Sequence, residues 1–76
     1  MFEMELAGGR SQRFSPRESD CVALLVRGYT DDEIAADLAI THATVRFHLS
    51  GARKKARARS RTHLAALAVA LGLAQP

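Results

Sequence analysis

The chain has 76 residues, with 11 Lys and Arg against 8 Asp and Glu, a formal net charge of +3 and a single cysteine. This length allows one small domain, which excludes most enzyme folds, and one cysteine excludes an internal disulfide framework or a multi-cysteine metal site. Its apolar runs are too short to cross a bilayer, and Glu3 and Glu5 stand where a signal peptide carries positive charge, so we expect a cytoplasmic protein without a membrane partner.

Residues 1–13 contain Gly8-Gly9 and no sustained hydrophobic period, so they are predicted to be a flexible tail or linker before a domain over 14–76. A first helix is predicted over 16–27. Ser15 is suited to the N-cap, a proline follows it, and Glu18 is placed to complete a capping box. Gly28 can supply the left-handed residue that ends this helix.

A second helix is predicted over 31–38. Thr30 and Glu33 repeat the capping box, and three carboxylates fall in the first turn, where the helix dipole favours negative charge. Only Ala39 and Ile40 separate this helix from the next predicted N-cap, Thr41. Such a short connection is typical of a helix-turn-helix.

The third helix, predicted over 42–56, has two different sides. Its apolar stripe consists of Val45, Leu49, Ala52 and Ala56. A second stripe, about 100° around the helix, consists of Arg46, Ser50, Arg53 and Arg57, with Ala43, Phe47 and Lys54 beyond it. A helix that is buried on one side and basic on the other is suited to the major groove of DNA, where arginine can contact guanine.

The charge distribution supports the same partner. The chain carries four bases and eight acids through Asp37, a formal charge of −4, and seven bases with no acid after it, a charge of +7. Clustered Lys and Arg favour a polyanion such as double-stranded DNA, because phosphates release counterions on contact. The alternative is a solvated basic surface without a ligand.

A fourth helix is predicted over 61–71 after the N-cap Ser60, which completes an all-α, four-helix bundle containing a helix-turn-helix. This helix is apolar almost all round. Leu64, Leu67, Ala68 and Leu71 form one stripe, and Ala65, Ala66, Val69 and Ala70 lie opposite. The second side is expected to contact another chain, unless its alanines are only good helix formers on a surface.

Four motifs in chain order resemble those of one family. They are Phe14-Ser15-Pro16-Arg17-Glu18, Gly28-Tyr29-Thr30-Asp31-Asp32-Glu33-Ile34-Ala35, Thr44-Val45-Arg46-Phe47-His48-Leu49, and Ser60-Arg61-Thr62 with Leu71-Gly72-Leu73. From residue 14 to 73 the sequence resembles the DNA-binding domain of the LuxR family of bacterial transcription regulators, most closely its quorum-sensing members.

The resemblance implies sequence-specific DNA binding, with the third helix in the major groove and the fourth helix dimerising on an inverted repeat. RNA polymerase is a further candidate partner, and no cofactor is expected. The implied base contacts are Arg46, Phe47 and Ser50. The implied contacts to the DNA backbone or flanking bases are Thr30, Thr44, His48, Arg53 and Lys54. The candidate dimerisation residues are Thr62, Ala65, Ala66 and Val69. Where the family ends its third helix with glycine this chain has Arg57, which is expected to let the helix run longer.

Other functions fit less well. No histidine has a second ligand at helical spacing or a carboxylate nearby after Asp37, so no metal site is expected, and no residue pattern indicates an enzyme. A different class remains open: a helix-turn-helix module that forms heterodimers with a full-length LuxR-family regulator and modulates it. The DNA-binding tail of a sigma factor is also conceivable, but the Thr-Val-x-x-His-Leu pattern and the apolar fourth helix argue against it.

Overall fold

The computed structural model describes residues 13–74, which form four helices and no strand. The helices are α1 (Pro16–Val26), α2 (Asp31–Leu38), α3 (His42–Ala56) and α4 (Arg61–Ala70). The predicted all-α fold is confirmed, and α1 and α4 each end one residue earlier than predicted. The predicted tail over 1–13 lies outside the described residues, apart from Arg13.

Every helix begins at the predicted N-cap. The side chains of Ser15, Thr30, Thr41 and Ser60 each accept a hydrogen bond from the backbone amide three residues later. In α1 and α2 the glutamate at that third position also accepts from the N-cap amide, which closes a capping box. These bonds satisfy amides that have no partner within the helix, so the helix starts are determined locally.

α3 ends at Ala56, as predicted, but the expectation for Arg57 is wrong. Arg57 does not lengthen the helix, since it adopts a left-handed conformation with φ of 55° and caps the helix directly after Ala56. The amide of Ala58 then donates to the carbonyl of Arg53 at 2.9 Å, which closes the helix end in the manner of a Schellman motif. This turn places Ala58 in the core at 6% exposure, so the chain reverses sharply toward α4.

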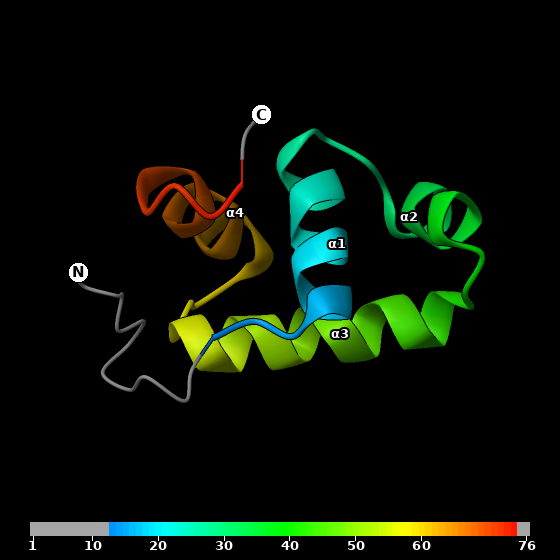
Figure 1. Cartoon of the computed structure of the whole chain (residues 1–76), viewed down its shortest axis with the longest axis horizontal. Helices are drawn as coiled ribbons and strands as arrows, with labels where there is room; N and C mark the ends of the chain where they lie inside the picture. The colour runs from blue at the N-terminus through cyan, green and yellow to red at the C-terminus, as the bar shows by residue number, and fades with distance from the viewer. Residues whose placement is uncertain (1–12, 75–76) are drawn as a thin grey trace.

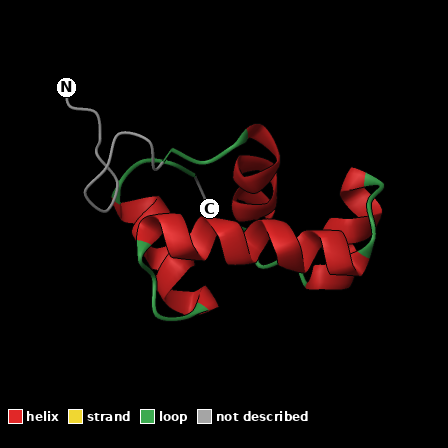
Figure 2. Cartoon of the chain, turned by 90° about the horizontal axis from the view of Figure 1, so that it is seen from below, coloured by secondary structure: helices red, strands yellow, loops and turns green. Residues whose placement is uncertain are grey.

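The four helices enclose one core. Its largest fully buried side chains are Ile34, Leu64, Val22, Val45 and Cys21. Figure 1 shows α1 crossing α3, with α4 and α2 on opposite sides of α1. In Figure 2, seen from below, α3 spans the width of the domain in front of the other helices. Within residues 13–74, no other helix covers the outer side of α3.

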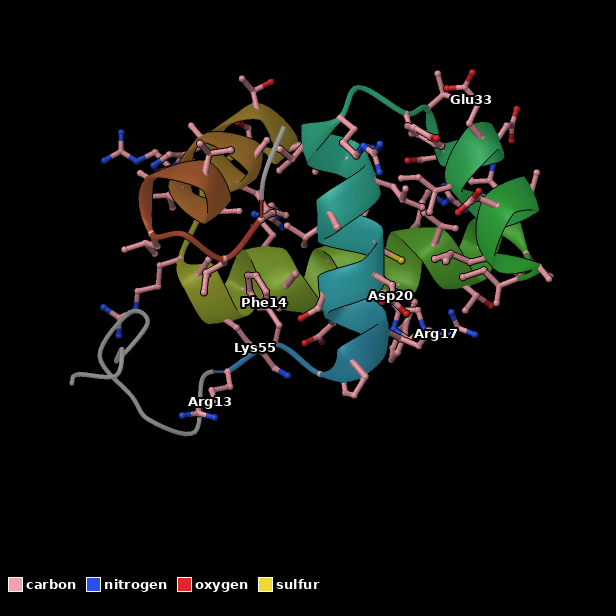
Figure 3. All side chains as sticks on the ribbon, turned by 45° about the horizontal axis from the view of Figure 1, so that its top comes forward. Arg13, Phe14, Arg17, Asp20, Glu33 and Lys55 are labelled. Carbon is pink, nitrogen blue, oxygen red and sulfur yellow. The ribbon has the colours of Figure 1, made fainter. Side chains whose placement is uncertain are left out.

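A buried carboxylate fixes α1 against α3. Glu18, 8% exposed, accepts hydrogen bonds at 2.8 Å from the Ser15 amide and from Lys55 Nζ. Figure 3 shows Lys55 extending from α3 toward the segment that leads into α1. A Cβ at Gly51 would lie 2.5 Å from Glu18 Oε2, so the missing side chain makes room for the carboxylate. Burial acts to raise the pKa of Glu18, but the bonds from Lys55 and Ser15 together lower it.

Candidate nucleic-acid interface

The outer side of α3 presents basic and apolar side chains together. Val45, Leu49 and Ala52 are buried, whereas Ala43, Arg46, Phe47 and Lys54 are exposed. Within residues 13–74, neither Arg46 nor Lys54 has a hydrogen-bond or ion-pair partner. Phe47 is 73% exposed, more than any other large apolar side chain in the described part of the chain. Two unpaired positive charges therefore flank an uncovered aromatic ring.

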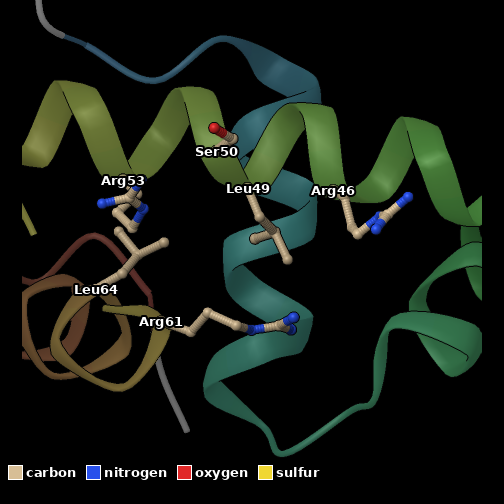
Figure 4. Close-up of a pocket in the computed structure, with 6 residues that line it drawn as sticks. All are labelled: Arg46, Leu49, Ser50, Arg53, Arg61 and Leu64. Carbon is tan, nitrogen blue, oxygen red and sulfur yellow. The ribbon is translucent and has the colours of Figure 1, made fainter. Parts of the chain in front are cut away.

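One flank of this side is hollowed. A pocket of about 250 Å³ lies between α3 and α4, lined by Arg46, Leu49, Ser50, Arg53, Arg61 and Leu64. Figure 4 shows Arg61 extending from α4 past α1, beneath the side of α3 that carries Arg46 and Arg53. Ser50 and Arg53 are half-buried, and Arg53 Nη1 donates to the carbonyl of Ala58 at 3.3 Å. The pocket is thus lined by two buried leucines and by three arginines, of which Arg61 is paired with Asp31.

The opposite flank carries the remaining candidate contacts on α3. Thr44 and His48 are both half-buried there, and the His48 ring meets the Phe47 ring edge-on. The Thr44 hydroxyl lies 2.8 Å from that of Thr41, the N-cap of α3. Thr30 is exposed at the start of α2, but its hydroxyl already accepts from the Glu33 amide. The candidate contacts Thr30 and Thr44 thus take part in the hydrogen bonds of a helix start and also lie at the surface.

The helix-turn-helix contains an ion-pair network that the sequence did not indicate. Asp31, at the start of α2, accepts from Arg61 Nη2 at 2.6 Å and lies 3.3 Å from His42 Nε2. Asp32 meets His42 Nδ1 at 2.8 Å. Asp31 and Arg61 are thirty positions apart, so no local pattern predicts their contact. The network joins the first residues of α2, α3 and α4.

This network corrects one expectation, since His42 does have carboxylates beside it. The sequence did not indicate this contact, because Asp31 and Asp32 lie on α2 and His42 lies on α3, beyond the turn between the two helices. Within residues 13–74, however, no group of three or more His, Cys, Asp or Glu side chains is arranged to hold a metal ion. Instead, the ring nitrogens of His42 lie 2.8 Å from an Asp32 oxygen and 3.3 Å from an Asp31 oxygen.

The hydrogen bond from Arg61 holds the pKa of Asp31 below its ordinary value of 3.8, against the opposing effect of burial. A carboxylate with a lowered folded pKa stabilises the fold above its unfolded pKa, and this contribution is lost as the pH falls through the folded value. We expect Asp31→Asn to lower the free energy of unfolding at neutral pH by about 1 kcal/mol, since Arg61 is part-exposed.

Urea unfolding at several pH values checks this expectation. The difference in unfolding free energy between Asp31→Asn and the unchanged chain should shrink as the pH falls through the lowered pKa of Asp31, since the carboxylate then becomes neutral. Asp32→Asn is the matched control, since the Asp32 side chain is 85% exposed and, within residues 13–74, is paired with His42 alone. It should lower the free energy of unfolding by less. If both variants lost the same free energy of unfolding, the contact between Asp31 and Arg61 would not contribute more to stability than the exposed contact of Asp32.

The network and the Glu18 contact also reduce the number of free bases. Of the seven Lys and Arg residues after Asp37, Lys55 is paired with Glu18, and Arg61 is paired with Asp31. Their charges hold the helices together. The charge left for a ligand is concentrated at Arg46 and Lys54 on α3 and at Arg57 and Arg59 in the turn after it, all of them exposed.

The outer side of α4 carries small and mostly apolar side chains. Thr62, Ala66 and Val69 are exposed, and Ala65 is half-buried. Val69, Leu71 and Leu73 are exposed by 42%, 48% and 39%, so exposed apolar side chains continue past the end of the helix. None of the helices described over residues 13–74 is long and apolar enough to span a membrane.

Comparison with known proteins gives consistent matches. Residues 12–68 match the family described as bacterial regulatory proteins, luxR family. The chain is 42% identical over 64 residues to the HTH-type quorum sensing-dependent transcriptional regulator RpaR of Rhodopseudomonas palustris, covering 84% of this chain and 26% of that protein. It is 40% identical over 60 residues to regulatory protein SdiA of Escherichia coli, covering 79% of this chain and 25% of that protein. The chain thus spans about a quarter of the length of these relatives. No solved structure matches it.

Proposed function

The chain belongs to the LuxR family of bacterial regulatory proteins, and we propose that its α3 enters the major groove of double-stranded DNA and recognises a specific sequence there. Residues 14–76 form the DNA-binding unit and residues 1–13 its tail or linker. The observation that carries this proposal is the uncovered outer side of α3, where Arg46 and Lys54 have no partner in the described protein. The major groove admits an α-helix, and its floor carries the base edges.

The proposed roles follow the position of each side chain. Arg46, Phe47 and Ser50 face the bases, since they lie on the outer side of α3 and on its hollowed flank. The proposed backbone or flanking contacts surround them and are Thr30, Thr44, His48, Arg53 and Lys54. Arg46 is the strongest candidate for sequence recognition, because an exposed guanidinium can donate two hydrogen bonds to one guanine.

Lys54 tests the division between base and backbone contacts. Its ammonium group is a point charge suited to phosphate, so Lys54→Ala should weaken binding to all DNA sequences to a similar degree. The slope of log affinity against log salt concentration should become shallower by about 1. Affinities for two unrelated duplexes at several salt concentrations give both quantities.

Lys55→Ala is the matched control for that experiment. Lys55 is the next residue on the same helix, but its Nζ is paired with Glu18. Its removal should lower stability and leave the salt slope nearly unchanged. If the two variants changed the salt slope equally, charge alone rather than the position on α3 would govern DNA binding.

We also propose that the domain binds as a dimer through the outer side of α4, with Thr62, Ala65, Ala66 and Val69 at the contact. The exposed apolar side chains at Val69, Leu71 and Leu73 support this, because exposed apolar surface on a small domain favours association with another chain. A two-fold dimer would place two copies of α3 on an inverted repeat. The name of the relative RpaR supports a role in quorum sensing-dependent transcriptional regulation. We further propose that the protein acts in the cytoplasm, with RNA polymerase as a candidate partner.

The first experiment is selection of bound duplexes from a random DNA pool by the 76-residue chain, followed by sequencing. Enrichment of an inverted repeat is the expected result. The second candidate function, a module that forms heterodimers with a full-length relative, is favoured by the same exposed apolar side chains. A folded chain that enriched no sequence, yet associated with such a relative, would support that function instead.

A further inference from the structure

Phe47 is placed where an apolar side chain has no protein partner. Within residues 13–74 the exposed large apolar side chains are Phe47, Val69, Leu71 and Leu73, and the last three lie in or just after α4. Phe47 is the most exposed of them, at 73%, and lies between Arg46 and Lys54 on the outer side of α3. The core beneath α3 is closed without it, since Val45 and Ala52 are fully buried at 0%. Phe47 is therefore not part of the hydrophobic core.

The aromatic ring has a neighbour that restrains it. The rings of Phe47 and His48 lie with centroids 5.4 Å apart and an interplanar angle of 68°, an edge-on contact that aromatic pairs favour. His48 is half-buried and belongs to the same rigid helix. Few rotamers are open to an aromatic side chain on a helix. The contact and the helix together limit the orientations of the ring in the unbound chain.

The floor of the major groove offers one kind of apolar group to such a ring. Guanine, adenine and cytosine present hydrogen-bond donors and acceptors there, whereas thymine adds a methyl group at C5. Phenylalanine has no polar atom to bond to the other base edges. We propose that Phe47 is a specificity-determining residue that binds the C5 methyl group of a pyrimidine, which thymine supplies in ordinary DNA. This inference rests on the proposed function of α3.

The test removes the methyl group and leaves every hydrogen bond of the base in place. Two random duplex pools are used, one with thymine and one with deoxyuridine at every thymine position. The chain should enrich a sequence with a strongly preferred thymine from the first pool. In the second pool the preference at that position should disappear while the others remain. In a defined duplex, deoxyuridine at that position should weaken binding about fourfold, the value expected for one buried methyl group.

The variant Phe47→Ala tests whether the aromatic ring causes the difference in affinity between the thymine and deoxyuridine duplexes. It should bind the thymine and deoxyuridine duplexes equally, and because Phe47 is so exposed it should unfold at nearly the same temperature as the unchanged chain. Lys54→Ala is the control on the same side of α3, and it should weaken binding to both duplexes while keeping their ratio. If Phe47→Ala kept that ratio as well, the methyl group would be recognised by another residue and the inference would be wrong.

The outcomes separate this inference from the proposed function. Equal enrichment of one sequence from both pools would overturn the methyl contact and leave sequence-specific binding intact. No enrichment from the thymine pool would overturn the proposed function itself. A further pair of duplexes carries cytosine or 5-methylcytosine at the preferred position, and methylation should strengthen binding about fourfold. Tighter binding to 5-methylcytosine than to thymine would identify methylated DNA as the source of the methyl group, and the reverse would identify thymine.

Discussion

Replacing Arg46 by alanine should weaken the free energy of binding to the selected operator by about 1 to 3 kcal/mol and remove the sequence preference at one base pair. The side chain is exposed on α3, and within residues 13–74 it makes no hydrogen bond or ion pair that its loss would break. The fold should therefore be unaffected. Competition binding with operators changed at each base pair in turn measures both the total loss and its position.

Two variants make this result specific. Arg46→Lys keeps the charge but replaces the planar guanidinium by a flexible ammonium group, so it should retain nonspecific affinity and weaken the preference for guanine. Lys54→Ala should lower the affinity for every operator variant alike. Thermal unfolding of each variant controls for stability. An unchanged preference at every base pair in Arg46→Ala would show that this part of α3 does not contact the bases.

The helix boundaries could be predicted because their causes are local. Each N-cap hydroxyl bonds to an amide three residues away, so Ser15, Thr30, Thr41 and Ser60 determine their helix starts within one turn. The buried side of α3 was likewise predictable, because the helix period alone brings Val45, Leu49 and Ala52 together. Arg57 was misjudged for a related reason. Its sequence position gives no sign that the bond from the Ala58 amide and the burial of Ala58 outweigh the strain of a left-handed arginine.

The partners of the charged residues could not be predicted, since they depend on how separate helices pack. Lys55 and Arg61 belong to the same basic stretch as Lys54, yet they pair with Glu18 and Asp31, which are 37 and 30 positions away. A count of bases therefore overestimates the charge available to DNA. The position of Phe47 on α3 followed from periodicity. Its degree of exposure depended on where α1, α2 and α4 pack, and this became known only with the tertiary structure.

Replacing Val69 by glutamate should abolish cooperative binding to an inverted repeat. Val69 is 42% exposed on the outer side of α4, so a longer polar side chain there can remain hydrated in a single chain. In the proposed dimer the same position becomes apolar and closed, and a carboxylate without a partner would cost several kcal/mol unless it were protonated. Affinity for the inverted repeat should fall at least tenfold, with the loss confined to the step in which the second copy binds.

A duplex with a single half-site is the control, because one copy of the chain binds it without using α4. The Val69→Glu variant should bind this duplex as the unchanged chain does, which also controls for the added negative charge. Val69→Ala removes apolar area without adding a charge and should weaken cooperativity less. If Val69→Glu kept full cooperativity, α4 would be outside the interface, and the homodimer contact through α4 and the heterodimer candidate, which depend on the same surface, would have to be abandoned.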